Sequence, residues 1–322
     1  MILGIESTAH TLGMGIVHKG KVLSNIGGTY RPVNEGIVPR KAADHHAEKF
    51  AGLLDANLKK AGVGIGKIDA IAYSEGPGLG ACLKTGLVGA KYIALKYGKR
   101  MVGVNHPFAH IKIAEGITGI RKPLLLYVSG GNTQLLIEKK KGEFHVLGET
   151  LDMGIGNLFD AFGRGIGMEY AHGAELVKVA ERGKYVPLPY AVKGMNLSFS
   201  GLLTQALKEA EVKGKKDVAH SLFETSFAML CEVCERALFL TRRKGLVVCG
   251  GVAQNRRLQE MLRTMCGEDG VEFGVAPDEY NRDNGAMVAY AGELIMKRAL
   301  RKPEDCTVDQ DYRVDRLRCH HY

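Results

Sequence analysis

The sequence predicts an α/β protein made of two similar halves, each a mixed β-sheet with helices on both faces. Strand-like segments repeat in the same order in the two parts of the chain, and helical sequence interrupts them at matching places. Each half opens on three short strands joined by tight turns, which indicates antiparallel pairing. The later strands alternate with helices, which indicates parallel additions to the same sheet.

The individual strands follow from short apolar runs bounded by glycine and polar turns. In the first half they are predicted at 1–6, 12–18, 21–26, 70–73 and 101–104. In the second half they are predicted at 124–128, 133–138, 143–147, 246–249 and 271–275. The fourth strand of each half runs directly into glycines and then into a helix.

We predict the halves at 1–118 and 119–301, with a linker near 116–123, where Gly, Thr and Pro cluster. A last long helix is expected at 284–301 and is expected to pack across both halves. The polar tail 302–322 is expected to be irregular and to pack back on the first half, with His320-His321 at a flexible end. A ligand would bind in the cleft between the halves.

Composition indicates a folded protein without a membrane span. Hydrophobic residues make up 45% and charged residues 25% of the 322 residues. The chain holds no apolar run of about 18 residues, and its N-terminus lacks the basic region of a signal peptide. Seven cysteines, an odd number, favour reduced thiols in a cytosol. Cys231 and Cys234 form a CxxC inside the helical segment 218–242, which we interpret as core positions rather than as a zinc or redox pair.

The net charge of +9 leaves two explanations open. One is an anionic partner, especially a nucleic acid, and the other is a lysine-rich solvated surface. The sequence carries no RRM, KH or zinc-finger pattern, so a nucleic acid would bind through surface charge.

A pair of histidines is the strongest local feature of the chain. His106 and His110 stand four residues apart and therefore share one face of a helix, and Pro107 suits a first helical position. Asp283, from a distant segment, would complete a three-ligand metal site with an open position. Such a pair alone is more often an ordinary packed pair, and the loops described next favour the metal.

Turns rich in glycine and hydroxyl groups end several strands. Glu6-Ser7-Thr8 and Ser129-Gly130-Gly131 occupy equivalent hairpin positions in the two halves, and Gly250-Gly251 leads from a strand into a helix. Glycine lets backbone N–H groups turn toward an anion, and a helix N-terminus favours phosphate. Paired turns of this kind predict a nucleotide cleft, which is the arrangement of the actin, Hsp70 and sugar-kinase (ASKHA) superfamily.

Short motifs run through nearly the whole chain and point to one family within that superfamily. They are AADHHAE at 42–48, GPGLG at 76–80, GVNHPFAH at 103–110, LYVSGGNTQ at 126–134, GETLD at 148–152, FSGLLT at 199–204, GGVA at 250–253 and DNGAM at 283–287. In content and order they resemble the tRNA threonylcarbamoyl-transferase family (TsaD), in its archaeal and eukaryotic KEOPS branch.

The resemblance implies a set of site residues. His106, His110 and Asp283 match the metal ligands, and Tyr127 matches a residue beside the metal that can also ligate it. The substrate and nucleotide contacts would be made by Tyr127, Val128, Ser129, Gly130, Gly131, Asp160, Gly173 and Asn255. Further contacts are expected from Glu6, Ser7 and Thr8. No general base is assigned.

The segment after Asp160 departs from the family pattern. The family usually has Pro-Gly-Gly-Pro followed by Ile-Glu, whereas this chain has AHGAELV at 171–177. Gly173 matches the second glycine, but the acid that meets ribose falls on Val177. Glu175 is a candidate substitute that would face differently on a helix. Asn196 stands where the family often has Asp.

The resemblance also implies an activity. The family transfers the threonylcarbamoyl group from threonylcarbamoyl-AMP to N6 of the adenosine 3′ of the anticodon in ANN-decoding tRNAs. It implies one divalent metal per subunit, iron or zinc, and ATP or threonylcarbamoyl-AMP in the cleft. The partners would be tRNA and KEOPS-type subunits, namely a kinase-like ATPase, a small dimerising subunit and an accessory subunit. A cytoplasmic location without a membrane is expected, and helical segments at 40–60 and 84–96 are expected to dock a partner.

Three other functions are alternatives to this one. A small-molecule kinase of the same fold would use the cleft without needing the histidine pair. A non-catalytic scaffold would bind nucleotide and partner proteins only. A zinc protease would need glutamate directly after the first histidine, where this chain has Pro107. His45 and His46 are neighbours on a predicted helix and cannot chelate together, so surface packing is their expected role.

Overall fold

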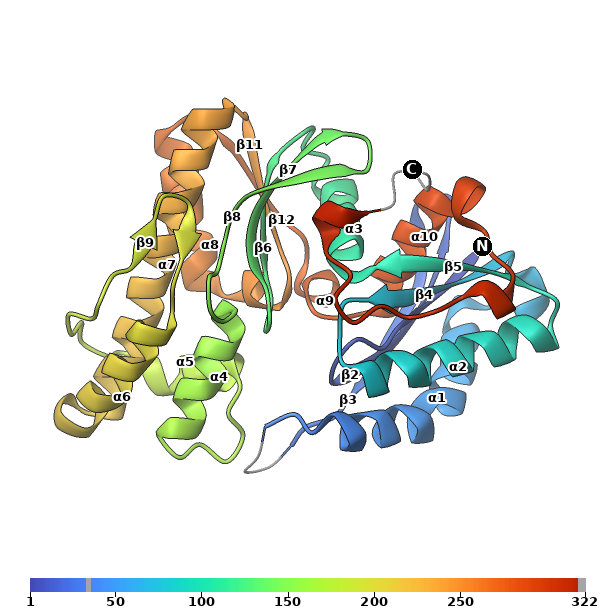
Figure 1. The fold of residues 1–322 in the computed structure, drawn as a ribbon, viewed down its shortest axis with the longest axis horizontal. Coiled ribbons are helices and arrows are strands. Elements are labelled where there is room, and N and C mark those ends of the chain that lie inside the picture. The colour runs from blue at the N-terminus through green and yellow to red at the C-terminus, as the bar shows by residue number, and fades with distance from the viewer. Residues whose placement is uncertain (33–35, 318–322) are drawn as a thin grey trace.

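The computed structural model describes residues 1–32 and 36–317 and contains two five-stranded mixed sheets side by side (Figure 1). The predicted end of the tail at His320-His321 lies outside the described residues. The first sheet has the order β3-β2-β1-β4-β5 and the second the order β12-β11-β6-β7-β8. In each sheet three antiparallel strands are extended by two parallel ones. The predicted fold class is confirmed.

The strands agree with the sequence pattern to within a few residues. Those of the first sheet are β1 (Ile2–Glu6), β2 (Thr11–His18), β3 (Lys21–Thr29), β4 (Ala70–Gly76) and β5 (Arg100–Asn105). Those of the second are β6 (Leu124–Val128), β7 (Thr133–Lys140), β8 (Glu143–Glu149), β11 (Gly245–Cys249) and β12 (Glu272–Val275). A short hairpin of β9 (Val192–Lys193) and β10 (Asn196–Leu197) lies apart from both.

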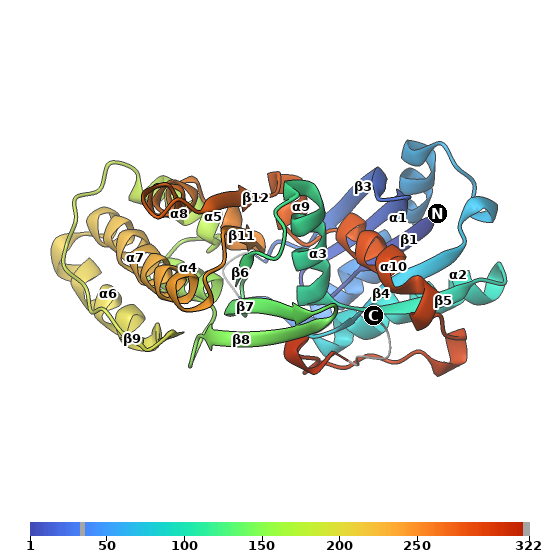
Figure 2. The same cartoon turned by 90° about the horizontal axis from the view of Figure 1, so that it is seen from above.

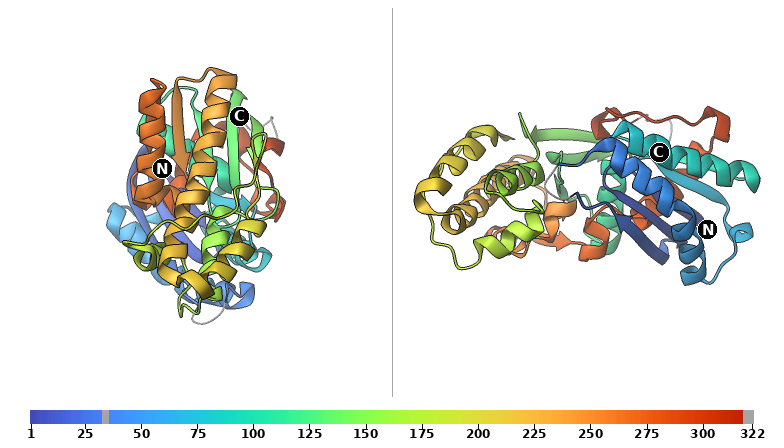
Figure 3. Two further views of the ribbon diagram at one scale, coloured as in Figure 1. Left: turned by 90° about the vertical axis from the view of Figure 1, so that its left-hand side faces the viewer. Right: turned by 90° about the horizontal axis from the view of Figure 1, so that it is seen from below.

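Helices cover both faces of the first sheet, because alternate residues of its strands are apolar on both sides. Leu3 and Ile5 of β1 face a core shared with α1 (Pro39–Ala61) and α2 (Gly80–Lys96). Ile2 faces the core shared with α3 (His106–Thr118) and α10 (Gly285–Ala299). Seen from above, α3 and α10 lie over the strands (Figure 2), and seen from below, α1 and α2 cover the other face (Figure 3).

The second sheet is covered mainly by helices on its outer face. These are α4 (Ile155–Gly165), α5 (Gly173–Ala180), α6 (Ser200–Lys213), α7 (Lys215–Thr241) and α8 (Arg256–Glu268). Its other face packs against α3, since Leu125 and Val247 belong to the same core as Ile111 of that helix. One helix, α3, thus lies between the two sheets and touches both.

Three glycines let α10 approach the first sheet closely. A Cβ atom added to Gly4 would lie 2.3 Å from the backbone nitrogen of Ala289, and one added to Gly15 would lie 2.3 Å from that of Ala286. Gly285 meets Gly15 at the same distance from the helix side. Real Cβ atoms do not approach backbone so closely, so these positions must be glycine for the helix to sit on the strands.

The connections differ from expectation at two places. The linker predicted at 116–123 is shorter, because α3 continues to Thr118 and ends at Gly119 in a left-handed conformation (φ 71°). The tail after α10 runs along the first sheet, where Tyr73 donates a hydrogen bond to the carbonyl of Thr307 (2.9 Å). It then reaches the second sheet, where Arg313 pairs with Glu149 (3.1 Å). The domain boundaries at 118 and 301 stay predictions.

No helix within residues 1–32 and 36–317 has both the length and the apolar character that crossing a bilayer requires.

Candidate metal centre

The histidine pair lies at the start of α3, as its sequence predicts. Asn105 precedes the helix, and its side-chain oxygen accepts a hydrogen bond from the backbone N–H of Phe108 (3.0 Å). Pro107 occupies the first turn, where a backbone N–H is not needed. The rings of His106 and His110 are 4.7 Å apart and nearly perpendicular, and both are buried.

Asp283 reaches the pair from the far end of the sequence. It directly precedes Asn284, whose side chain caps α10 by accepting from the N–H of Met287. One carboxylate oxygen of Asp283 lies 3.2 Å from Nε2 of His110 and 3.5 Å from Nε2 of His106. One ligand atom from each of these three side chains lies within 4.8 Å of the others.

Glu6 fixes the orientation of His106. Nδ1 of His106 donates to one carboxylate oxygen of Glu6 (3.0 Å), which also accepts from the hydroxyl of Ser74 (2.5 Å). The other oxygen accepts from the backbone N–H (2.7 Å) and the hydroxyl (2.5 Å) of Thr8. The carboxylate is fully buried. Nε2 of His106 is therefore left to face Asp283, as expected of a metal-binding histidine with a carboxylate on its other nitrogen.

The charges around His106 favour a cation. Burial alone would lower the pKa of His106, but the carboxylates of Glu6 and Asp283 outweigh it and raise this pKa to about 9. Despite burial, which opposes ionisation, His106 holds the pKa values of Glu6 and Asp283 below their usual range. Burial lowers the pKa of His110, which favours its neutral form. The centre thus combines two carboxylates with two imidazoles.

Tyr127 is the last feature of this centre. It is buried at the end of β6, with its ring 5.6 Å from that of His110. Burial raises the pKa of Tyr127, and the nearby Ser129 opposes this rise in part. Within the described residues the hydroxyl of Tyr127 has no hydrogen-bond partner. Nδ1 of His110 is also buried without a partner there. Two imidazole nitrogens, a carboxylate and an unpaired phenol fit a divalent iron or zinc ion.

The loop Ser129-Gly130-Gly131 is held by the start of α4. The carbonyl of Ser129 accepts from the N–H of Gly156 (3.1 Å), and the carbonyl of Gly130 accepts from that of Asn157 (2.9 Å). A Cβ added to Gly156 would lie 2.7 Å from the Cα of Gly130, so only glycine fits at position 156 of the helix. A Cβ added to Gly131 would meet nothing within 4 Å. This open side leaves room for a ligand to approach the loop.

The predicted nucleotide residues Asp160 and Gly173 lie together. The carboxylate of Asp160 accepts from the backbone N–H of Gly173 (2.9 Å), and burial raises its pKa. His172 caps α5 by accepting from the N–H of Ala174 (3.2 Å), and its ring lies 6.5 Å from that of His10 in the first half. Segments from both halves therefore meet beside Asp160.

The two candidates for a ribose contact both lie on α5. Val177 is 43% exposed on α5. The side chain of Glu175 pairs with Lys178 on the same helix (2.6 Å). The ribose contact stays a prediction for both residues.

The glycine pair after β11 is also explained by packing. Gly250 has φ 97°, and a Cβ there would lie 2.3 Å from the carbonyl oxygen of Val128 at the end of β6. Gly251 faces open space. Asn255 caps α8, with its side chain accepting from the N–H groups of Arg257 and Leu258. Its amide nitrogen stays available to a ligand.

The remaining predicted positions have structural roles. His46 is buried and contacts the carbonyl of Ala9 (3.0 Å), so the expectation of surface packing is wrong for this residue. Cys234 is buried and Cys231 is half-buried, and both are free thiols, as expected of core positions. Asn196 accepts from the N–H of Glu149 (3.0 Å).

Known proteins resemble this chain over nearly its whole length. The family model described as TsaD, tRNA N6-adenosine threonylcarbamoyltransferase, matches residues 21–290. A protein of that name from Thermococcus sibiricus is 48% identical over 98% of both chains. This chain belongs to the TsaD family. Membership confirms the family predicted from the motifs, and it confirms the prediction of an enzyme of the transferase class.

Two further similarities extend this result. One relative comes from Methanothermobacter thermautotrophicus and is named probable bifunctional tRNA threonylcarbamoyladenosine biosynthesis protein. It is 47% identical over 98% of this TsaD-family chain, which spans 60% of that longer protein. The crystal structure of HypF from T. kodakarensis superimposes with a TM-score of 0.65 at 16% identity. It covers 95% of this chain and 49% of its own. The HypF likeness shows the fold alone.

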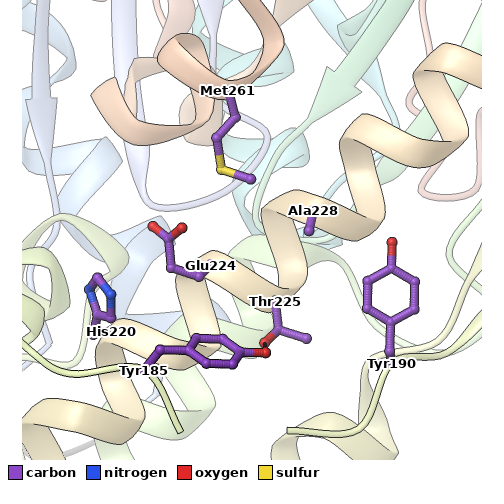
Figure 4. Close-up of a pocket in the computed structure, with 7 residues that line it drawn as sticks. All are labelled: Tyr185, Tyr190, His220, Glu224, Thr225, Ala228 and Met261. Carbon is purple, nitrogen blue, oxygen red and sulfur yellow. Dashed lines mark hydrogen bonds between the residues drawn. The ribbon is translucent and has the colours of Figure 1, made fainter. Parts of the chain in front are cut away.

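A separate hollow of about 340 Å³ lies in the second half, and none of the residues that line it is a predicted site residue (Figure 4). It is lined by Tyr185, Tyr190, His220, Glu224, Thr225, Ala228 and Met261. Its two tyrosines lie on the loop before β9, across from α7 and α8. Its one carboxylate, Glu224, pairs with Arg257 (2.7 Å), so the charge of this carboxylate is already balanced.

Proposed function

We propose that this chain transfers a threonylcarbamoyl group from threonylcarbamoyl-AMP to N6 of the adenosine 3′ of the anticodon in ANN-decoding tRNAs. The observation that carries the proposal is the buried group of His106, His110 and Asp283, with Glu6 on the outer nitrogen of His106. Family membership and the names of the relatives support tRNA modification as the process.

The proposed reaction is an acyl transfer. N6 of adenosine forms a bond to the carbamoyl carbon, the bond from that carbon to the phosphate oxygen breaks, and AMP leaves with the electron pair. The proton from N6 passes to the phosphate or to solvent. A divalent metal held by His106, His110 and Asp283 would supply positive charge for the oxygens on which negative charge develops.

The side chains and loops around the metal would position the substrate. Glu6 keeps Nε2 of His106 directed at Asp283, so the ligands are oriented before a metal binds. Backbone N–H groups of Gly130 and Gly131 lie beside the open space at that loop and would donate to a carbonyl or phosphate oxygen. Tyr127 offers its unpaired hydroxyl at the same place.

The nucleotide would lie between the halves. Asp160, Gly173 and Asn255 would bind its adenosine part. Gly173 and Asn255 lie at the N-termini of α5 and α8, and Asp160, in the middle of α4, accepts a hydrogen bond from the N–H of Gly173 (2.9 Å). The ribose contact at Glu175 or Val177 stays a prediction. Whether ATP also binds, the KEOPS-type partners and the cytoplasmic location stay predictions.

The test is transfer to unmodified tRNA. The full chain, its KEOPS-type partners and synthetic threonylcarbamoyl-AMP are combined, and wild type is compared with the double variant His106→Ala, His110→Ala. We expect modified tRNA with wild type only, and loss of bound metal in the variant. His145→Ala is the control, because that histidine is exposed on β8. Equal activity of the double variant would refute the metal-centred proposal.

A tRNA-independent activity would favour the kinase alternative. Phosphorylation of a small acceptor by ATP, without modified tRNA in any reaction, would replace the proposal with that alternative.

A further inference from the structure

A second hollow, of about 510 Å³, lies between the two halves. We call it the lysine hollow. It is lined by Phe108, Lys112, Lys122, Glu138, Lys139, Lys140, Lys141, Leu294 and Ile295. These residues come from α3, from the connection after it, from the β7–β8 hairpin and from α10. In two views the tip of this hairpin extends past α3 toward the first sheet (Figures 1 and 2).

The lysine hollow is distinct from the metal centre. Phe108 and Lys112 stand four residues apart on α3 and share one face of the helix. Each follows a histidine of the pair by two residues, which is about 200° around the helix axis. The histidines and the hollow therefore lie on opposite sides of the same helix.

The floor of the hollow is apolar and closely packed. The rings of Phe108 and Phe144 pack edge to face at 6.1 Å, and Ile295 is buried. Lys112 lies over both rings, at 5.7 and 5.3 Å from their centres. Its charge is already balanced by Glu115 (2.8 Å) and Glu138 (2.7 Å). Leu294 adds an apolar side chain that is 49% exposed.

The rim carries positive charge that the described part of the chain does not balance. Lys122, Lys139, Lys140 and Lys141 are exposed, and none of them forms an ion pair with a described carboxylate. Arg243 joins them by donating to the carbonyls of Lys122 (2.8 Å) and Glu138 (3.1 Å). Like charges from separate segments repel one another, so their convergence disfavours folding unless an anion binds among them.

We propose that the lysine hollow binds backbone phosphates of the tRNA substrate, with a nucleoside against its apolar floor. This inference rests on the proposed function for the identity of the RNA. Lysines act as mobile point charges and fit a ligand whose charges repeat along one backbone. An acidic protein segment would match the charge too, but RNA carries one phosphate per nucleotide, so a short stretch of it meets several rim lysines at once. The tRNA would thereby contact both halves at once.

The test measures tRNA affinity of the full chain as a function of salt. The triple variant K122Q/K139Q/K141Q is compared with wild type and with the control K213Q/K215Q/K216Q, which removes the same charge at the junction of α6 and α7. We expect the first variant to bind about tenfold more weakly. The slope of log affinity against log salt should become shallower by about 2, as the loss of three phosphate contacts implies. The control should change affinity by less than about twofold.

The outcomes separate this inference from the proposed function. If wild type binds tRNA and the two triple variants bind equally well with equal salt slopes, the lysine hollow is not an RNA site and only this inference fails. If wild type alone binds no tRNA, this inference fails, and the transfer assay with the partner subunits decides the proposed function separately. If the first variant binds tRNA normally but no longer associates with the partner subunits, the surface docks protein and the inference is overturned. Circular dichroism of each variant verifies that the fold is intact.

Discussion

Replacing Glu6 with glutamine should weaken metal binding while leaving the fold in place. Glu6 offers two acceptor oxygens to four donors: His106, Ser74, and the N–H and hydroxyl of Thr8. A glutamine of similar volume offers one oxygen and one NH₂ group. Whichever way the amide is turned, either His106 or Thr8 then faces a donor. His106 also loses the nearby negative charge that balances a cation.

The expected loss is about 10- to 100-fold in metal affinity, the range for removing the outer partner of a metal-binding histidine. This corresponds to about 1.4–2.7 kcal/mol. The assay is competition for Zn²⁺ or Co²⁺ between the protein and a coloured chelator, with thermal unfolding followed in parallel.

Glu75→Gln is the matched control for this variant. Glu75 is another buried acid, on β4, and it pairs with Arg301 (2.7 Å) rather than with the histidines. Its loss should cost stability, since a neutral amide replaces the buried carboxylate that pairs with Arg301, and should leave the metal dissociation constant unchanged. Wild-type metal affinity in Glu6→Gln, or equal losses in both variants, would refute the reasoning.

Three further predictions concern the frame around the centre. Gly4→Ala should destabilise the protein by about 3 kcal/mol or prevent folding, because its Cβ would lie 2.3 Å from the backbone of α10. Gly66→Ala should leave stability unchanged, because open space surrounds that position. Urea unfolding measures the free energy of unfolding of both variants. Asn105→Ala should lower the free energy of unfolding by about 1 kcal/mol or more in the same assay, because it removes the cap of α3. Asn105→Asp should be less destabilising, because it keeps the cap and loses the amide N–H that donates to the carbonyl of Tyr312 (2.7 Å). Burial lowers the pKa of His46 from 6.5 to about 4, so the unfolded chain takes up a proton first as pH falls. Unfolding free energy should therefore drop between these values by at most about 1.4 kcal/mol per pH unit, and His46→Gln should flatten that part of the profile.

Each of these predictions has a contradicting result. Equal stability of Gly4→Ala and Gly66→Ala would mean that α10 can shift without cost. Asn105→Asp as unstable as Asn105→Ala would mean that the bond to Tyr312, not the helix cap, dominates. A His46→Gln profile parallel to wild type would mean that His46 does not titrate on unfolding.

Local sequence features predicted much of the candidate site. Asn105 and Pro107 signal the start of α3, and the spacing of His106 and His110 puts both on one face, so their proximity needed no tertiary information. The paired glycine turns likewise predicted where ligands would approach. These features are readable because caps, turns and helical spacing act over a few residues.

Other parts of the site were beyond such reasoning. Ser74 was missed, because a single serine at a strand end carries no signal. It meets Glu6 because β4 pairs with β1 in parallel across a long connection. Glu6 was expected on the substrate side, and its hydrogen bond with His106 (3.0 Å) is known only from the structure. The ribose contact was placed at Val177 or Glu175 from the family pattern, and it stays a prediction.

The sequence by itself determined the class of fold, the family and the helix that carries the histidine pair, because periodicity, turn residues and motifs are written in neighbouring positions. Tertiary structure alone decided the order in which the parallel strands join each sheet and that α10 packs on the first sheet. It also decided how closely Asp283, which the motifs group with the histidines, approaches His110 (3.2 Å) across 173 residues of chain. It also gathered the lysines of three segments around one hollow. Such contacts depend on how whole surfaces fit together, and no local interaction specifies them.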